Sequence, residues 1–180
     1  KKVDLLIVNA GGFRKKIYQD LGKELSAIEP PFWTALTAGF IRKKGFDVKI
    51  LDANAENLDL NETIEKIKIF NPNLVNIIVY GQHPSASTPL MPVIGKLTEE
   101  LKIKYPELKI ILTGLHPSAL PERTMKEEKC DFVADGEGFY TLLGLLEKRE
   151  ISKIPGLWYR DRNEIKSNPR AELIKNLDEE

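Results

Sequence analysis

The sequence predicts an α/β protein with a doubly wound, five-stranded parallel sheet and a C-terminal β-hairpin. Five apolar runs of strand length alternate with segments of helical period along the 180-residue chain. The connections between them are short, and such alternation is typical of a parallel sheet with helices on both faces. With 42% hydrophobic residues, the chain has enough apolar side chains to bury the core of one domain.

The strands are expected at 3–10, 46–52, 73–80, 108–114 and 130–134. The first run, VDLLIVNA, is continuously apolar, which predicts a strand buried on both faces. The second, FDVKILD, alternates between apolar and polar residues. A chain of this length fits a flavodoxin-like, Rossmann-like strand order of 2-1-3-4-5.

The helix boundaries follow from proline, glycine and capping residues. Pro30-Pro31 predicts the start of the first helix, and Gly45 its end. Asp59 or Asn61 is expected to begin the second helix. The remaining expected helices are 87–105, capped by Ser87 or Thr88, then 121–129 and 139–149.

The C-terminal part of the chain departs from the strand–helix alternation. Residues 155–169 form two extended segments around Asp161-Arg162-Asn163, which predicts a hairpin. We therefore expect a domain over residues 1–150, followed by a hairpin and linker over residues 151–180.

The composition narrows the classes of partner and compartment. Lys and Arg total 27, as do Asp and Glu, so the chain lacks the basic excess that nucleic acid or an anionic membrane would require. No apolar run approaches the ~20 residues that span a bilayer, and no signal peptide is visible. The single cysteine, Cys130, excludes an internal disulfide and a thiolate-only metal site. We expect a cytoplasmic protein.

Two nearly identical hexapeptides are the most informative feature. GQHPSA at 81–86 and GLHPSA at 114–119 contain both histidines, His83 and His116. Each follows a predicted buried strand, and the carboxyl ends of parallel strands meet at one edge of a sheet, where ligands bind. The NAGGF turn (9–13) and the GEG turn (136–138) fall at the same predicted edge. Ordinary turn chemistry explains each turn alone, but their coincidence favours a ligand site.

Several other ligand-binding motifs are absent from the sequence. There is no GxxxxGK[ST] phosphate loop and no GxGxxG fingerprint after a strand. The Ser/Thr-rich loop of flavodoxins is missing after the first strand. A phosphorelay receiver needs carboxylates where this chain has Asn9-Ala10 and Tyr80-Gly81. Asp52 has no partner visible in the sequence, and no nucleophile–base pair stands out.

Five stretches in order resemble the N-terminal cobalamin-binding domain of cobalamin-dependent radical S-adenosylmethionine proteins. They are PPFWTALTAGFIRKKGFDVKILDA (30–53), VYGQHPSASTPLM (79–91), TGLHPSALPERTM (113–125), CDFVADGEGFYTLLGLL (130–146) and IPGLWYRDRNEIKSNPR (154–170). The resemblance implies cobalamin as cofactor. It also implies a downstream radical S-adenosylmethionine domain, with a 4Fe–4S cluster and S-adenosylmethionine in the full-length protein.

The resemblance also assigns a cofactor site along the carboxyl edge of the sheet. The implied cofactor-binding residues are Asn9, Gly11, Gly12, Gly81, Gln82, Ser85, Ser87, Thr113, Gly114, Leu115, His116, Ser118, Gly136, Glu137 and Gly138. No catalytic residue and no metal ligand is assigned. In the methionine-synthase type of cobalamin domain, an Asp-x-His-x-x-Gly motif after the first strand gives cobalt its lower histidine ligand. This motif is missing here, which implies cobalt without a protein histidine below it. His83 is therefore expected to lie in a loop or contact the tail of the cofactor.

The chain departs from the family pattern at three points. Thr113 replaces the first glycine of a Gly-Gly-x-His pattern, and Phe139 replaces an acidic residue. The three-cysteine motif that holds the cluster is absent, so this chain alone is not expected to catalyse the radical reaction. A cofactor-free interaction or regulatory domain, and a flavodoxin-like binder of another phosphate-bearing ligand, remain alternatives. Gly114→Val is expected to weaken cobalamin binding while the fold survives.

Overall fold

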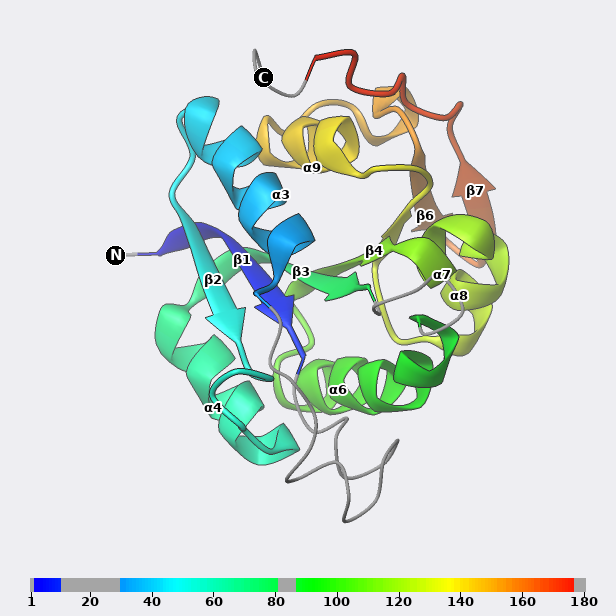
Figure 1. Ribbon diagram of the computed structural model, residues 1–180. Coiled ribbons are helices and arrows are strands. Elements are labelled where there is room, and N and C mark those ends of the chain that lie inside the picture. Colours follow the sequence, from blue (N-terminus) through cyan, green and yellow to red (C-terminus); the bar gives the residue numbers. More distant parts are fainter. Residues whose placement is uncertain (1, 11–29, 81–86, 177–180) are drawn as a thin grey trace.

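In a computed structural model, which describes residues 2–10, 30–80 and 87–176, the chain forms a mixed sheet between two helical layers (Figure 1). The sheet has seven strands in the order β2-β1-β3-β4-β5-β6-β7. Four parallel pairings join the first five, which confirms the predicted order 2-1-3-4-5. The five are β1 (Val3–Asn9), β2 (Val48–Asp52), β3 (Pro72–Val79), β4 (Lys109–Gly114) and β5 (Phe132–Ala134).

The predicted hairpin is confirmed, and it continues the main sheet. Strands β6 (Leu157–Asp161) and β7 (Glu164–Ser167) are antiparallel and are joined at Arg162-Asn163. Strand β6 pairs antiparallel with β5, with Val133 opposite Trp158. The hairpin thereby covers the edge that β5 would otherwise expose. The division into units 1–150 and 151–180 stays a prediction.

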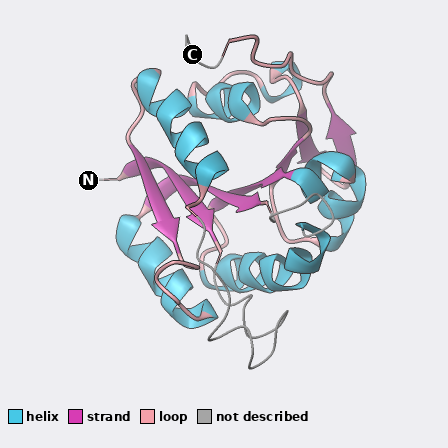
Figure 2. Ribbon diagram, viewed as in Figure 1, coloured by secondary structure: helices cyan, strands magenta, loops and turns pink. Residues whose placement is uncertain are grey.

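Helices cover both faces of the sheet, which confirms the doubly wound architecture (Figure 2). One face carries α3 (Phe32–Lys43) and α9 (Phe139–Leu146), and its apolar core includes Ile41 and Leu142. The opposite face carries α4 (Leu60–Phe70), α6 (Met91–Lys104) and α8 (Pro121–Glu127), with Ile64, Leu97 and Met125 in its core. No helix within these described ranges is long and apolar enough to cross a membrane.

Most helix boundaries agree with the capping signals in the sequence. Helix α4 begins after Asp59, whose carboxylate accepts from the Glu62 backbone N–H while the Glu62 side chain accepts from the Asp59 N–H. This reciprocal capping selects Asp59 over Asn61. The expected Ser87 or Thr88 cap is wrong. A 3-10 turn at Thr88–Leu90 precedes α6, without a side-chain capping bond from Ser87.

The second hexapeptide is helical after its first residue, whereas its glycine, proline and serine suggest a turn. Residues Leu115–Ala119 form the short helix α7, directly after β4 and before α8. The chain turns from strand to helix at Gly114, whose φ is +119° and ψ is −172°. This backbone region is essentially restricted to glycine. Gly114 therefore has a conformational role in the fold.

Candidate functional site

The carboxyl half of the sheet is polar on one face and apolar on the other. On the face under α3 and α9, the sheet carries Asn9, Asp52, Asn76, Tyr80 and Thr113. The alternating residues Val8, Leu51, Ile77, Val79 and Leu112 belong to the apolar core of the opposite face. Since successive side chains in a strand point to opposite faces, the polar groups of these strand ends collect under α3 and α9. We call these five residues the polar face.

One end of the polar face is a hydrogen-bonded pair that long-range strand pairing brings together. The Asn9 Nδ2 donates to Asp52 Oδ1 over 2.9 Å, and the same oxygen accepts from the Ala55 backbone N–H over 3.0 Å. Asn9 and Asp52 are register partners at the ends of β1 and β2. The partner of Asp52 is therefore Asn9, which lies 43 residues away in the sequence.

The central part of the polar face joins β3 to β4. Thr113 Oγ1 donates to Asn76 Oδ1 over 2.9 Å, and both residues are buried. Gly138, which precedes α9, lies directly against Thr113: a Cβ at Gly138 would stand 3.3 Å from Thr113 Cγ2. Thr113 and Gly138 were predicted site residues, and the structure brings them together.

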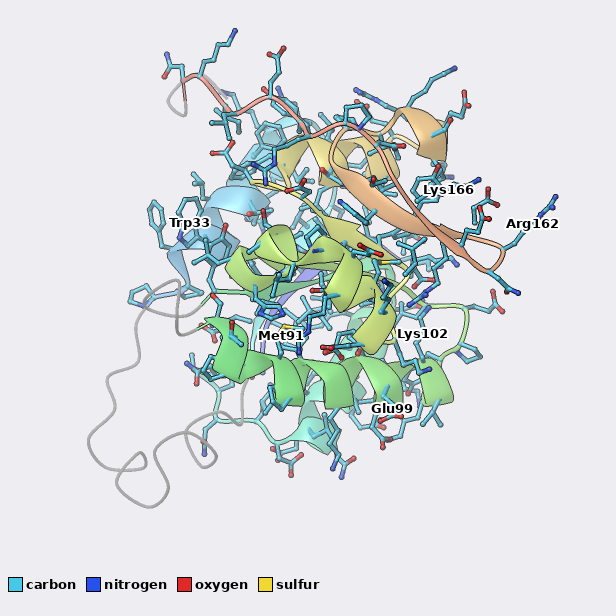
Figure 3. The ribbon with its side chains drawn as sticks, turned by 90° about the vertical axis from the view of Figure 1, so that its right-hand side faces the viewer. Trp33, Met91, Glu99, Lys102, Arg162 and Lys166 are labelled. Carbon is cyan, nitrogen blue, oxygen red and sulfur yellow. The ribbon has the colours of Figure 1, made fainter. Side chains whose placement is uncertain are left out.

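Aromatic rings lie at the outer end of this face. Trp33, in the first turn of α3, stacks on Tyr80 with ring centroids 5.1 Å apart and an interplanar angle of 10°. Figure 3 shows Trp33 on the side of the molecule where α6 begins at Met91, opposite the hairpin turn at Arg162. Burial raises the pKa of Tyr80, and the negative charge of Glu137 adds to the effect. A half-exposed indole beside a phenol offers a flat surface to an aromatic or macrocyclic ligand.

His116, in the second hexapeptide, contacts Thr88, which lies shortly after the first hexapeptide. Its Nδ1 lies 2.9 Å from Thr88 Oγ1, and the imidazole is buried. Burial lowers the pKa of His116, the positive charge of Arg123 lowers it further, and Glu127 acts in the opposite direction. This bond holds α7 against the start of α6, so the first role of His116 is to position the two segments relative to each other.

The lowered pKa of His116 predicts loss of stability in mild acid. Below a pH of about 6.5, the unfolded chain binds a proton that the folded protein binds only at lower pH, so the free energy of unfolding falls with pH in that window. We expect a shallower fall for His116→Asn, whose side chain stays neutral. Chemical denaturation between pH 7.5 and 5.5 measures this difference, and identical pH profiles for the two proteins would refute it.

Ser118 supports the GEG turn. Its hydroxyl accepts from the Gly136 backbone N–H over 2.8 Å and lies 3.5 Å from Asp135 Oδ1. Arg170 forms an ion pair with the same carboxylate, and the Ile174 N–H donates to Glu137 over 3.0 Å. The segment after the hairpin is thus fastened to the turn at Asp135 and Glu137.

Ser118→Ala should therefore loosen the GEG turn. The variant leaves the Gly136 N–H without its acceptor, and we expect a loss of about 1 kcal/mol in the free energy of unfolding. Urea denaturation measures this loss. Unchanged stability would show that water replaces the hydroxyl without cost.

The other predicted site residues are accounted for as follows. Leu115 begins α7 and is half-buried, and Ser87 is fully buried just before the 3-10 turn. Gly11, Gly12, Gly81, Gln82, His83 and Ser85 lie outside the described residues.

Three residues of the candidate site were not predicted from the sequence: Asn76, Tyr80 and Trp33. The signal for Asn76 was present as an asparagine inside the apolar run LVNIIV.

Within the described ranges, no group of three or more His, Cys, Asp or Glu residues could hold a metal ion. Cys130 is buried, and desolvation raises the pKa of its thiol to about 12. A thiol with this pKa is protonated at neutral pH and is a poor nucleophile and metal ligand.

A cavity of ≈ 470 Å³ lies at the other end of the sheet. It is lined by residues at the amino ends of the strands, among them Asp4, Asn73 and Lys109, and by Leu146 and Arg149. Ligands of open parallel sheets bind at the carboxyl ends instead. The polar face, with the stacked rings of Trp33 and Tyr80 at its outer end, is therefore the stronger candidate site.

The chain matches one protein family and has relatives among known proteins. The family model described as the B12 binding domain matches residues 18–146. An uncharacterized methyltransferase from Pyrococcus horikoshii is 34% identical over 83% of this chain. An anaerobic magnesium-protoporphyrin IX monomethyl ester cyclase from Cereibacter sphaeroides is 26% identical over 89%. The chain spans only 32% and 27% of the length of these two relatives.

Solved structures share the fold at low sequence identity. The radical S-adenosylmethionine methyltransferase TsrM from Kitasatospora setae, with cobalamin and a 4Fe–4S cluster bound, superposes with a TM-score of 0.72 at 18% identity. The match covers 98% of this chain and 30% of that one. The cobalamin-dependent S-adenosylmethionine radical enzyme OxsB, with aqua-cobalamin and S-adenosylmethionine bound, gives 0.67 at 19% identity. This match covers 96% of this chain and 23% of the OxsB chain.

Proposed function

Because the chain belongs to the B12-binding domain family, we propose that it is the cobalamin-binding module of a larger radical S-adenosylmethionine enzyme. The observation that carries this proposal is the family match over residues 18–146, which contain every residue of the polar face except Asn9. The catalytic domain, with its 4Fe–4S cluster and S-adenosylmethionine, would lie outside this chain. A methyl transfer or a rearrangement is the reaction class proposed for the whole enzyme.

The residues of the described site offer groups whose polarity suits cobalamin. This cofactor combines a wide, flat corrin ring with a narrow nucleotide tail. A tail needs hydrogen-bonding groups within an otherwise apolar slot, and the polar face offers the carboxamide of Asn76, which the Thr113 hydroxyl orients beneath α3 and α9. A corrin ring needs a broad surface at the strand ends, where Trp33 and Tyr80 stack.

When bound, cobalamin supplies a cobalt atom that carries a methyl group or an open coordination position. The protein's own residues then bind and orient the cofactor. Asn76 would hold a polar atom of the tail, Thr113 would orient the Asn76 carboxamide, and α3 and α9 would exclude water from the tail. His116 and Ser118 act through other residues, since they fix α7 and the GEG turn around the site.

Retention of hydroxocobalamin after desalting tests this function. We expect the purified protein to keep a red visible spectrum in about a one-to-one ratio, and to release flavin in the same experiment. A colourless protein that is folded by circular dichroism would favour the cofactor-free interaction domain. Retained flavin would favour the flavodoxin-like binder.

A further inference from the structure

Asn76 is a polar residue at the centre of the apolar sheet. It lies in the middle of β3, opposite Ile7 of β1 and Ile111 of β4. Its side chain is 0% exposed. Leu74 and Ile78, its nearest neighbours on the same face of β3, both belong to the apolar core under α3 and α9. An asparagine is a costly residue for such a position unless its carboxamide is fully hydrogen-bonded.

Only half of this carboxamide is satisfied. The Oδ1 accepts the Thr113 hydroxyl over 2.9 Å. The Nδ2 is completely buried and has no hydrogen-bond partner in the part of the chain that the structure describes. Burial of a donor without an acceptor is destabilising and uncommon in native proteins, so each case calls for an explanation.

Other polar groups packed under α3 and α9 do have partners. Asn9 donates to Asp52, the Thr37 hydroxyl donates to the Trp33 carbonyl, and the Thr141 hydroxyl donates to the Pro155 carbonyl. Packing alone does not require a carboxamide at Asn76, because leucine has nearly the same branched shape without a donor. The unused N–H of Asn76 is thus a specific feature of this face.

We infer that Asn76 Nδ2 donates a hydrogen bond to an uncharged acceptor of the nucleotide tail, an oxygen of the ribose or a ring nitrogen of the base. This inference rests on the proposed function and assigns one residue to one part of the cofactor. The acceptor is uncharged because a buried phosphate would need a paired cation. Thr113 is a positioning residue: its hydroxyl holds Oδ1 and thereby fixes the direction in which Nδ2 points.

The experiment compares two corrinoids and four variants of this chain. Cobalamin carries the nucleotide tail, and cobinamide carries the corrin ring without it.

The double variant Asn76→Leu/Thr113→Val removes both polar partners together, so that neither remains unsatisfied. Asn76→Ala removes the donor without adding bulk. Thr113→Val keeps the donor. Thr98→Val removes a buried hydroxyl on the opposite face, where Thr98 donates to the Gly95 carbonyl, and is the matched control.

We expect the double variant and Asn76→Ala to bind cobalamin about tenfold more weakly, which corresponds to about 1.4 kcal/mol. Their affinity for cobinamide should stay within about twofold of the wild type. Thr113→Val should lose less cobalamin affinity, and Thr98→Val none. Thermal unfolding without cofactor should show that the double variant is at least as stable as the wild type.

Wild-type cobalamin affinity in both Asn76 variants would overturn the inference, as would an equal loss for cobalamin and cobinamide. Neither result would affect the proposed function, because the wild-type protein would still bind cobalamin. Failure of the wild type to bind cobalamin would instead refute the proposed function itself.

Discussion

Gly114→Val should abolish folding, with a loss of more than about 4 kcal/mol in the free energy of unfolding. A Cβ at Gly114 would stand 2.3 Å from the Val79 carbonyl oxygen and 2.7 Å from its carbon, both of which are backbone atoms of the neighbouring strand. The φ of +119° adds strain for any side chain. Circular dichroism and urea denaturation of the purified variant measure the effect.

The expectation that the fold survives Gly114→Val is therefore wrong. Gly39→Ala is the matched control, because Gly39 is exposed within α3 and a Cβ there meets no atom within 4 Å. We expect this control to gain about 0.5–1 kcal/mol, since alanine is the better helix former. A well-folded Gly114→Val protein would contradict the close approach between β3 and β4.

Phe139→Ala should cost about 3–5 kcal/mol of stability, the usual range for a buried phenylalanine. Phe139 is 2% exposed at the start of α9, and its ring packs edge-on against Phe40 of α3, with centroids 5.3 Å apart. The contact joins the two helices that cover the polar face. We therefore expect weaker cobalamin binding together with a melting temperature lower by roughly 10 °C.

Two further substitutions at Phe139 separate packing from polarity. Phe139→Leu keeps most of the apolar volume and should lose clearly less stability than Phe139→Ala. Phe139→Asp restores the acidic residue of the family pattern but buries an unpaired carboxylate, so it should be at least as destabilising as Phe139→Ala. A stable Phe139→Asp protein would show that this position tolerates charge and that the observed core contact is unimportant.

Strands β1, β3, β4 and β5 were predictable because each is an apolar run that parallel pairing buries, and β2 was predictable from its alternation of apolar and polar residues. The helical conformation of α7 was not predictable. The segment is short and lacks periodicity, and Pro117 biases the preceding His116 away from helix. In the structure, His116 is helical and its imidazole is held by Thr88, 28 residues away. Such a contact has no signature in local sequence.

The candidate site was predictable in position but only partly in its residues. Glycines and hydroxyls at the strand ends indicated the carboxyl edge of the sheet, and Thr113 and Gly138 do meet there. The pairs Asn9–Asp52 and Asn76–Thr113 depend on strand register across the sheet, over 43 and 37 residues of sequence. The sequence shows each member of these pairs, whereas only the folded sheet brings the members together.

A crystal structure of this chain with cobalamin would test most directly whether the polar face holds the cofactor. The expected result is a nucleotide tail between the sheet and helices α3 and α9, with a tail acceptor within hydrogen-bonding distance of Asn76 Nδ2. The corrin ring should lie over the carboxyl ends of β1, β3 and β4. A tail bound elsewhere, such as in the cavity at the amino ends of the strands, would contradict this placement.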